Sequence, residues 1–223
     1  MLTYSISQCV EAFSTMRDDR LPYPVLQPHQ VHDDKIVVVE RTDMTRDDLE
    51  GVDALMTAIP DYAIAVRTAD CVPVLLFDPV HKVVAAVHSG WRGTVARISR
   101  KTISLMTDRF GTRPDDLLAV IGPSIGPDSF QVGKEVADQF AASGFPMDSI
   151  LSDRGERVEG TMAGGLHIDL WEANRWILLQ AGVRTENIQV AGICTYERND
   201  LFFSARHEGR KCGRIINSIK IKP

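Results

Sequence analysis

Runs of apolar residues broken by short polar segments predict several β-strands along the chain. Two apolar, β-prone runs, residues 74–77 and 83–87, are separated only by a short segment that opens with Asp78-Pro79. Because Asp followed by Pro is a common opening of a reverse turn, this pattern predicts a β-hairpin. Further strands are expected at residues 35–40, 62–66, 117–121, 188–193 and 201–204.

Residues at helical spacing predict three helices. The first is expected to begin at the turn around Gly90 and to end at Gly111, because glycine commonly follows the last helical residue. The third is expected to begin after Asp169, whose side chain can cap a helix, and to end at Gly182. The positions that carry the pattern are Val95, Ile98, Thr102, Leu105 and Phe110 for the first helix, Val132, Val136 and Phe140 for the second, and Leu170, Ala173, Trp176 and Ile177 for the third.

The order of these elements favours an α+β fold. Long strands that are paired through hairpins, with helices set apart from them, are typical of this class rather than of a doubly wound parallel sheet. No low-complexity linker and no repeat of fixed period divides the chain. We therefore expect residues 1–223 to form a single domain.

Composition and charge narrow the possible partners. The chain is 44% hydrophobic and 25% charged, which is typical of a globular protein, and its net charge of −5 lacks the basic excess of a nucleic-acid-binding protein. No apolar run is long enough to span a membrane, and the first residues lack a basic segment that leads into an apolar stretch. We therefore expect a cytoplasmic protein without nucleic-acid or membrane partners. Its four cysteines are widely spaced and do not suggest a disulfide framework.

Cys71 and His88 flank the predicted hairpin. If the turn is centred between Pro79 and Val80, the two residues are directly opposed, and opposed residues of an antiparallel pair hold their Cβ atoms about 4.5 to 5.5 Å apart. A slip of one residue would place the two side chains on opposite faces of the sheet. The hairpin therefore predicts that a sulfur and an imidazole lie close together.

A third imidazole, at His32, would complete a metal site. Two histidines and one cysteine can hold zinc tetrahedrally and leave the fourth position to water or substrate. His29 is an alternative to His32, and spacing does not separate the two. Asp70 adds a carboxylate beside the thiol. The other histidines have no comparable neighbours and are expected to be solvated or structural: His81, His167 and His207.

The segment Ser89-Gly90-Trp91-Arg92-Gly93 is a candidate for binding an anion. A glycine-rich turn that enters a helix exposes backbone N–H groups, which suits a phosphate, although an ordinary tight turn has the same composition. Arg67 and Arg92 flank the two halves of the site, so an anionic substrate is expected to contact Arg67, Arg92 and Ser89. Trp91 could stack on a flat ring or pack in the core.

The motifs together resemble those of the YfiH-like laccase-domain family. The matching segments are Gln30-Val31-His32, Thr68-Ala69-Asp70-Cys71-Val72-Pro73-Val74-Leu75, Val87-His88-Ser89-Gly90-Trp91-Arg92-Gly93-Thr94, Ile121-Gly122-Pro123-Ser124-Ile125-Gly126-Pro127 and Phe202-Phe203-Ser204. Members of this family are described as polyphenol oxidases and as purine nucleoside phosphorylases with adenosine deaminase and methylthioadenosine phosphorylase activity. The resemblance implies a four-layer α/β/β/α sandwich with zinc held by His32, Cys71 and His88. It also implies that the loop at 122–126 and the segment at 202–206 complete the pocket.

The chain departs from the family pattern in two places. The segment that precedes Gln30 is shorter than usual and lacks the Asn-Leu-Gly and Asn-Arg stretches that help to form the pocket wall. Ser124 stands where many members have a cysteine, and Ser129-Phe130-Gln131 replaces a Cys-Cys-Tyr-Glu type of sequence. Neither departure involves the three expected ligands.

Four functions are consistent with these residues. The leading one is zinc-dependent conversion of purine nucleosides, by phosphorolysis with phosphate and by deamination, with Asp70 as a candidate proton carrier. The second is copper-dependent oxidation of phenols, although six histidines without a His-x-His pair do not supply the ligands of a multicopper centre. The third uses Cys71 as a metal-free nucleophile activated by His88. The last is a non-enzymatic binding module.

Overall fold

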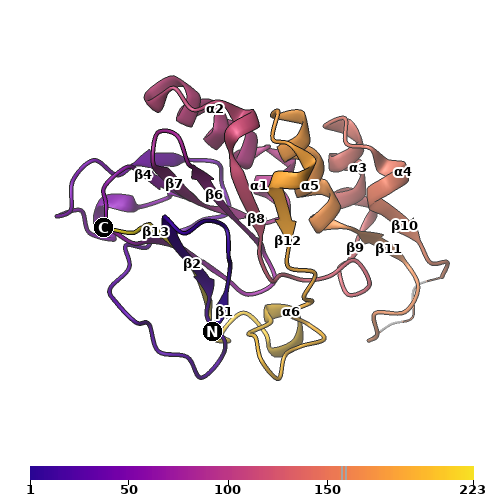
Figure 1. Ribbon diagram of the computed structural model, residues 1–223. Coiled ribbons are helices and arrows are strands. Elements are labelled where there is room, and N and C mark those ends of the chain that lie inside the picture. The colour runs from indigo at the N-terminus through magenta and orange to yellow at the C-terminus, as the bar shows by residue number, and fades with distance from the viewer. Residues whose placement is uncertain (157, 159) are drawn as a thin grey trace.

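The structure is a computed structural model that describes residues 1–156, 158 and 160–223. Its strands are β1 (Leu2–Thr3), β2 (Val10–Ser14), β3 (Ile36–Val38), β4 (Ala54–Thr57), β5 (Ile64–Thr68), β6 (Val72–Asp78), β7 (Val83–Ser89), β8 (Leu118–Ile121), β9 (Gln131–Val132), β10 (Leu151–Asp153), β11 (Leu166–Ile168), β12 (Ile188–Val190) and β13 (Ile215–Ile221). Its α-helices are α1 (Trp91–Val95), α2 (Ile98–Phe110), α3 (Lys134–Ala142), α4 (Met147–Ile150), α5 (Leu170–Gln180) and α6 (Ala205–Glu208). Figure 1 shows their arrangement.

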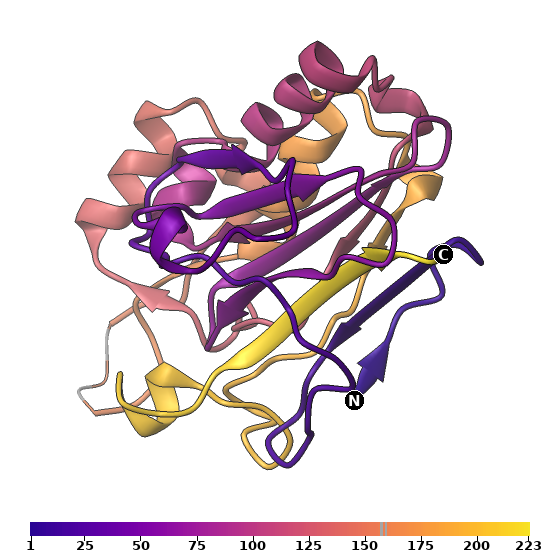
Figure 2. The ribbon, with the colours of Figure 1, turned by 90° about the vertical axis from the view of Figure 1, so that its left-hand side faces the viewer.

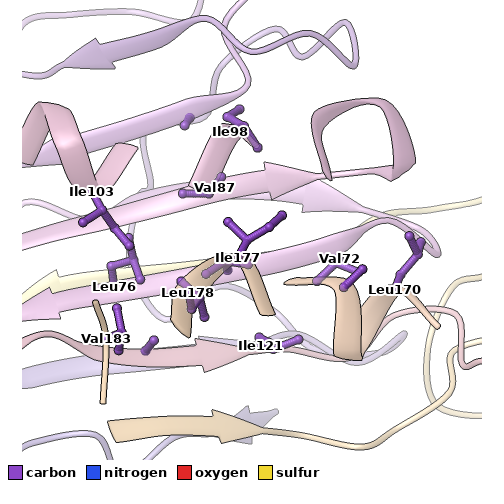
Figure 3. Packing of buried hydrophobic residues seen from close by; sticks show 14 of the residues in the cluster. Val72, Leu76, Val87, Ile98, Ile103, Ile121, Leu170, Ile177, Leu178 and Val183 are labelled. Carbon is purple, nitrogen blue, oxygen red and sulfur yellow. The ribbon is translucent and has the colours of Figure 1, made fainter. Parts of the chain in front are cut away.

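A six-stranded sheet forms the centre, in the order β12-β8-β6-β7-β4-β3. The predicted hairpin is confirmed as β6 and β7, and every residue of both strands is buried because both faces of the sheet are covered. On one face, side chains such as Leu76 and Val87 pack against α2 and α5 (Figure 3). The central pairs are antiparallel, whereas the two edge pairs, β3 with β4 and β12 with β8, are parallel.

A second sheet, in the order β1-β2-β13-β5, covers the other face of the six-stranded sheet. Leu75 and Phe77 of β6 point into a core that they share with Ile64 of β5 and Ile219 of β13. Figure 2 shows β13, in yellow, crossing beside the central strands. The sequence pattern did not predict β2 or β13, nor β4 of the six-stranded sheet.

The protein thus has a mixed α/β fold with helices, a six-stranded sheet and a four-stranded sheet in successive layers. The preference for mostly antiparallel pairing is confirmed, whereas the fourth, helical layer of an α/β/β/α sandwich and the single-domain organisation stay predictions. A small third sheet, β10-β11-β9, lies next to α3 and α4. None of the helices in the described ranges combines the length and the apolar character needed to cross a membrane.

The first predicted helix is divided in two. Arg97, between α1 and α2, has a left-handed backbone with φ of 58°, which costs a non-glycine residue about 1–2 kcal/mol. Its guanidinium donates a hydrogen bond to the carbonyl oxygen of Ser143 at 2.7 Å and lies 5.3 Å from the ring centroid of Trp176. These contacts offset the backbone strain, and helical spacing alone does not reveal the break.

The other predicted elements are mostly confirmed, although Val132, expected in the second helix, lies in β9, and α3 begins at Lys134. Asp169 caps α5, since its carboxylate accepts a hydrogen bond from the backbone N–H of Glu172 at 2.9 Å. The strand expected at 201–204 is wrong. That segment is a turn that ends at Ser204, whose hydroxyl accepts a hydrogen bond from the backbone N–H of His207 and caps α6. The remaining strands, at 35–40, 62–66, 117–121 and 188–193, are present with shifted or shorter bounds.

Candidate metal centre

His32, Cys71 and His88 come together at one end of the central hairpin. One ligand atom from each lies within 4.8 Å of the other two, and the two imidazole rings meet edge to face with centroids 4.9 Å apart. His88 is buried, Cys71 is half-buried and His32 is exposed. The cluster is therefore closed on its His88 side and open on its His32 side.

The register that brings Cys71 near His88 differs from the predicted one. The structure pairs Pro73 with His88, which places Cys71 opposite Gly90 rather than opposite His88. The predicted direct opposition is wrong by two residues. A shift of two preserves the face of the sheet, so Cys71 and His88 remain diagonal neighbours on the same side.

Asp78 explains this register. Its carboxylate accepts hydrogen bonds from the backbone N–H groups of Val80 at 2.8 Å and His81 at 3.0 Å, which closes a turn one residue later than expected. The next residue, Lys82, has φ of 55° and leads into β7. A local side-chain contact therefore sets which residues of the hairpin face each other.

Gly90 leaves room for the sulfur of Cys71. A Cβ atom at this position would lie 3.0 Å from the Sγ atom of Cys71 and 3.5 Å from Cδ2 of His32. The missing side chain lets the thiol and the imidazole occupy the space above the end of β7. This explains the glycine that directly follows His88-Ser89.

The buried carboxylate of Asp53 joins two of the clustered residues. Oδ1 accepts hydrogen bonds from Nδ1 of His88 at 2.6 Å and from the backbone N–H of His32 at 3.0 Å. Oδ2 accepts from the backbone N–H groups of Val31 and Asp33 at 3.1 and 3.0 Å. With Nδ1 of His88 engaged in this way, Nε2 is the ring nitrogen that is available to a metal.

Sequence reasoning missed Asp53. The available signal was an acidic residue inside the apolar run Val52-Asp53-Ala54-Leu55-Met56, where a charge is costly to bury unless it is paired. The loop that bears His32 needs this anchor, because His32 itself has a left-handed backbone with φ of 66°.

Gln30 anchors the same loop on β5. Its side-chain amide donates to the carbonyl oxygen of Arg67 and accepts from the backbone N–H of Arg67, each at 2.8 Å. His29, the alternative to His32, instead turns outward and forms an exposed pair with Glu50. The structure therefore brings His32 rather than His29 to Cys71 and His88.

The remaining histidines lie elsewhere. The Nδ1 atom of His81 is 2.9 Å from the carboxylate of Asp78, in the hairpin turn. His167 is buried and contacts the carbonyl oxygens of Met162 and Gly165. His207 packs against the ring of Tyr196. None of them belongs to a group of candidate ligands within the described residues.

Cys71 and His88 influence each other's protonation. Burial alone would raise the pKa of Cys71, but the charge of His88 and hydrogen bonds with His32 and His88 lower this pKa below its ordinary value. Burial would lower the pKa of His88, but the charge on Cys71 and the hydrogen bond with Asp53 raise it. The thiolate, the form in which cysteine binds a metal, is therefore favoured.

A cavity of about 970 Å³ opens beside the cluster. Its wall includes all three clustered residues together with Asp70, Arg67, Arg92, Trp91 and Phe130. Ile125, Ala205 and Arg206, from the two segments expected to complete the pocket, also line it. The guanidinium of Arg92 lies over the ring of Trp91, 4.4 Å from its centroid.

Ser89 and Asp70 have contacts of their own. Ser89 is fully buried, its hydroxyl lies 3.1 Å from that of Thr94, and it is not part of the cavity wall. The carboxylate of Asp70 accepts hydrogen bonds from the hydroxyl of Thr195 at 2.7 Å and from the backbone N–H of Arg206 at 2.6 Å. Asp70 thereby ties the strand end that bears Cys71 to the start of α6.

The donor set of the cluster fits a metal ion. One thiolate and two imidazoles are donors that zinc and copper both accept, and three protein ligands with one open side are typical of catalytic zinc sites. In the part of the chain that the structure describes, His32, Cys71 and His88 form the one group of at least three candidate ligands. The geometry therefore supports a mononuclear site.

Comparison with known protein families shows which family the chain belongs to. The family described as multi-copper polyphenol oxidoreductase laccase matches residues 8–222. The chain belongs to this family. A Bacteroides thetaiotaomicron protein named purine nucleoside phosphorylase is 43% identical over 208 residues, which cover 91% of this chain and 75% of that protein.

One further relative and one solved structure agree with this assignment to the laccase-domain family. A protein from an unknown prokaryote, named adenosine deaminase RL5, is 38% identical over 201 residues, which cover 87% of this chain and 74% of that protein. The crystal structure of the Bacillus licheniformis hypothetical protein YfiH matches with a TM-score of 0.80 and 33% identity, and covers 89% of this chain and 74% of that one. The expected YfiH-like membership is thus confirmed.

Proposed function

We propose that this laccase-domain protein is a zinc-dependent purine nucleoside phosphorylase that also has adenosine deaminase and methylthioadenosine phosphorylase activity. The observation that carries the proposal is the cluster of His32, Cys71 and His88 at the wall of a large cavity. The relatives named purine nucleoside phosphorylase and adenosine deaminase support the two reaction types. Purine nucleosides and phosphate are the corresponding substrates.

His32, Cys71 and His88 would hold the zinc ion. When bound, zinc supplies a Lewis acid that makes water more acidic and polarises an oxygen or nitrogen atom of the substrate. The open side of the cluster, next to the exposed His32, is where a substrate would approach. Asp53 keeps the ring of His88 in one orientation and one tautomer.

The cavity residues would bind and orient the substrates. Arg67 and Arg92 are placed to contact phosphate, since guanidinium groups bind phosphate through paired hydrogen bonds. Trp91, held under Arg92, offers an aromatic face near the cluster. Asp70 remains the candidate proton carrier for the departing base, although both of its oxygens already accept a hydrogen bond.

Replacing Cys71 with Ala tests the proposal. The variant C71A should lose bound zinc and should no longer release hypoxanthine from inosine and phosphate, because two imidazoles alone hold zinc weakly. The matched control is C9A, which removes an exposed thiol that is not part of the cavity wall. Undiminished hypoxanthine release by C71A would refute the proposed centre.

Copper-dependent oxidation of phenols is the second candidate. The description of the family favours it, and a site of nitrogen and sulfur donors also accepts copper. The described residues contain a single group of three candidate ligands, which argues against a centre with several copper ions. Metal analysis of protein purified without added copper, with a phenol oxidation assay before and after copper loading, separates the two candidates.

A metal-free thiol nucleophile is the third candidate, favoured by the contact between Cys71 and His88 that lowers the pKa of the thiol. Activity that resists metal chelators but is lost on thiol alkylation would support it. Loss of activity with a chelator, followed by recovery with zinc, would exclude it.

A further inference from the structure

The cavity beside the metal cluster is strongly basic, although the chain as a whole is acidic. Seven arginine and lysine side chains belong to its wall, against one carboxylate, that of Asp70. The wall therefore has an excess of six positive charges in a protein whose net charge is −5. Basic residues gathered in this way attract anionic ligands and raise their local concentration.

None of these seven cations forms an ion pair with a carboxylate among the residues that the structure describes. Elsewhere in the chain, arginine and lysine side chains such as Arg17, Arg109 and Lys134 are paired with acidic neighbours. Within the cavity, Arg206 instead donates to the carbonyl oxygen of Gln131 at 3.1 Å, and Arg92 packs on Trp91. Their charges are therefore left for a ligand to neutralise.

Three of the arginines form a subgroup: Arg46, Arg67 and Arg214. Arg67 pairs with Ile216 in the β5–β13 ladder, and Arg214 directly precedes β13, so the two arginines lie at the same end of this ladder and in the same cavity wall. Burial lowers the pKa of Arg67, and the charges of Arg46 and Arg214, which line the same cavity, lower it further. Repulsion between like charges costs stability unless an anion lies between them.

Arg214 is also held in place by the backbone. Its guanidinium donates to the carbonyl oxygens of Gly213 and Arg210, each at 2.9 Å. These bonds orient the side chain but leave its charge uncompensated. Arg210 and Lys211, from the same segment, extend the basic wall.

Phosphorolysis itself requires one phosphate, and one or two guanidinium groups are enough to bind it. Arg92, four residues after His88, and Arg67, four residues before Cys71, are the candidates for that role. Even with Arg67 in that role, Arg46 and Arg214 of the subgroup have no partner in the proposed reaction of nucleosides. A second phosphate, carried by the substrate itself, would supply one.

We propose that the cavity binds purine nucleoside 5′-monophosphates, with the 5′-phosphate on Arg46, Arg67 and Arg214. The identity of the base and sugar rests on the proposed function, whereas the second anion site rests on the arginine subgroup. In phosphorolysis of such a nucleotide, the bond from N9 to C1′ breaks and a phosphate oxygen bonds to C1′. The departing base takes up a proton, and the products are the free base and ribose 1,5-bisphosphate.

Binding of inosine 5′-monophosphate and of inosine to the zinc-loaded protein, measured by calorimetry, tests the inference. The nucleotide should bind about tenfold more tightly, which corresponds to about 1.4 kcal/mol, and the preference should shrink as salt is added. A third measurement uses inosine with saturating orthophosphate. It shows whether free phosphate alone occupies the anion sites of the basic wall.

The variant R46Q should abolish most of the preference for the nucleotide, and R46K should retain it. Arg46 is exposed and its side chain makes no hydrogen bond within the described residues, so its replacement should not disturb the fold. R100Q, which removes an exposed arginine of α2 that is outside the cavity wall, is the control and should behave as the unmodified protein.

Equal affinity for the nucleotide and the nucleoside would overturn the inference, and so would a preference that R46Q and R214Q leave unchanged. Hypoxanthine release from inosine with no preference for the nucleotide would refute only the second anion site. Tight binding of the nucleotide that R46Q weakens, without turnover of any nucleoside, would refute the proposed reaction and leave the anion site standing.

Discussion

Asp53 and His88 are joined by a 2.6 Å hydrogen bond between a buried carboxylate oxygen and Nδ1 of the ring. The same carboxylate holds the backbone of the loop that bears His32. One side chain thus sets the distance between two of the three candidate ligands. Asp53 lies outside the two sequence motifs that contain His32 and His88.

Removing the side chain of Asp53 should weaken metal binding. We expect D53A to bind zinc about 10- to 100-fold more weakly, the usual effect of losing the carboxylate that supports a ligating histidine. Competition with a chromophoric chelator measures this affinity. D34N, which removes a half-buried carboxylate of the same loop that pairs with Lys101, is the control. A zinc affinity of D53A equal to that of D34N would contradict the positioning role.

Adding a methyl group at Gly90 should disturb the cluster directly. In G90A the new Cβ would lie 3.0 Å from the sulfur of Cys71, so the thiol or β7 must move. We expect lower zinc stoichiometry and lower activity with a small loss of thermal stability. Elemental analysis measures the zinc content, hypoxanthine release from inosine measures activity, and thermal unfolding measures stability. Full zinc occupancy in G90A would show that the sulfur does not need this space.

Asp78 should make stability depend on pH in the acid range. Burial raises the pKa of Asp78, but the side chain of Thr112, together with the hydrogen bonds from His81 and Val80, outweighs burial and lowers it. A carboxyl group with a lowered pKa stabilises the fold above its unfolded pKa of about 3.9, and this stabilisation is lost as the pH falls through the folded value.

The variant D78N removes that contribution. As the pH decreases below about 4, the free energy of unfolding of D78N should decrease less steeply than that of the unmodified protein. Urea unfolding over a range of pH values measures the slope. D138N, which alters an exposed carboxylate of α3, should keep the original slope. Identical slopes in D78N and D138N would be inconsistent with the role assigned to Asp78.

Phe77 lies in the core between the two larger sheets and has no exposed surface. F77A should lower the free energy of unfolding by about 3–5 kcal/mol, because a large cavity replaces the ring. V80A, at the exposed hairpin turn, should have little effect. Urea denaturation compares the two. A small effect at Phe77 would mean that the sheets repack closely around the vacancy.

Local patterns in the sequence determined the hairpin, the strands of the central sheet other than β4, and the cap of α5. Each depends on residues within a few positions of one another, such as Asp169 and Glu172, so no distant contact is needed to form it. Two candidate ligands, Cys71 and His88, were also found from local sequence because they flank one hairpin, and the third was left between His29 and His32. Whether they bind a metal stays a proposal.

Only the tertiary structure decided the features that depend on distant residues. The break at Arg97 needs Ser143 and Trp176, and the pairing of β13 with β2 joins the two ends of the chain. The choice of His32 over His29 needs Asp53, and the basic wall unites arginines from residue 46 to residue 214. Such contacts form because the whole chain packs to bury its apolar surface, and no local pattern records which distant residues then become neighbours.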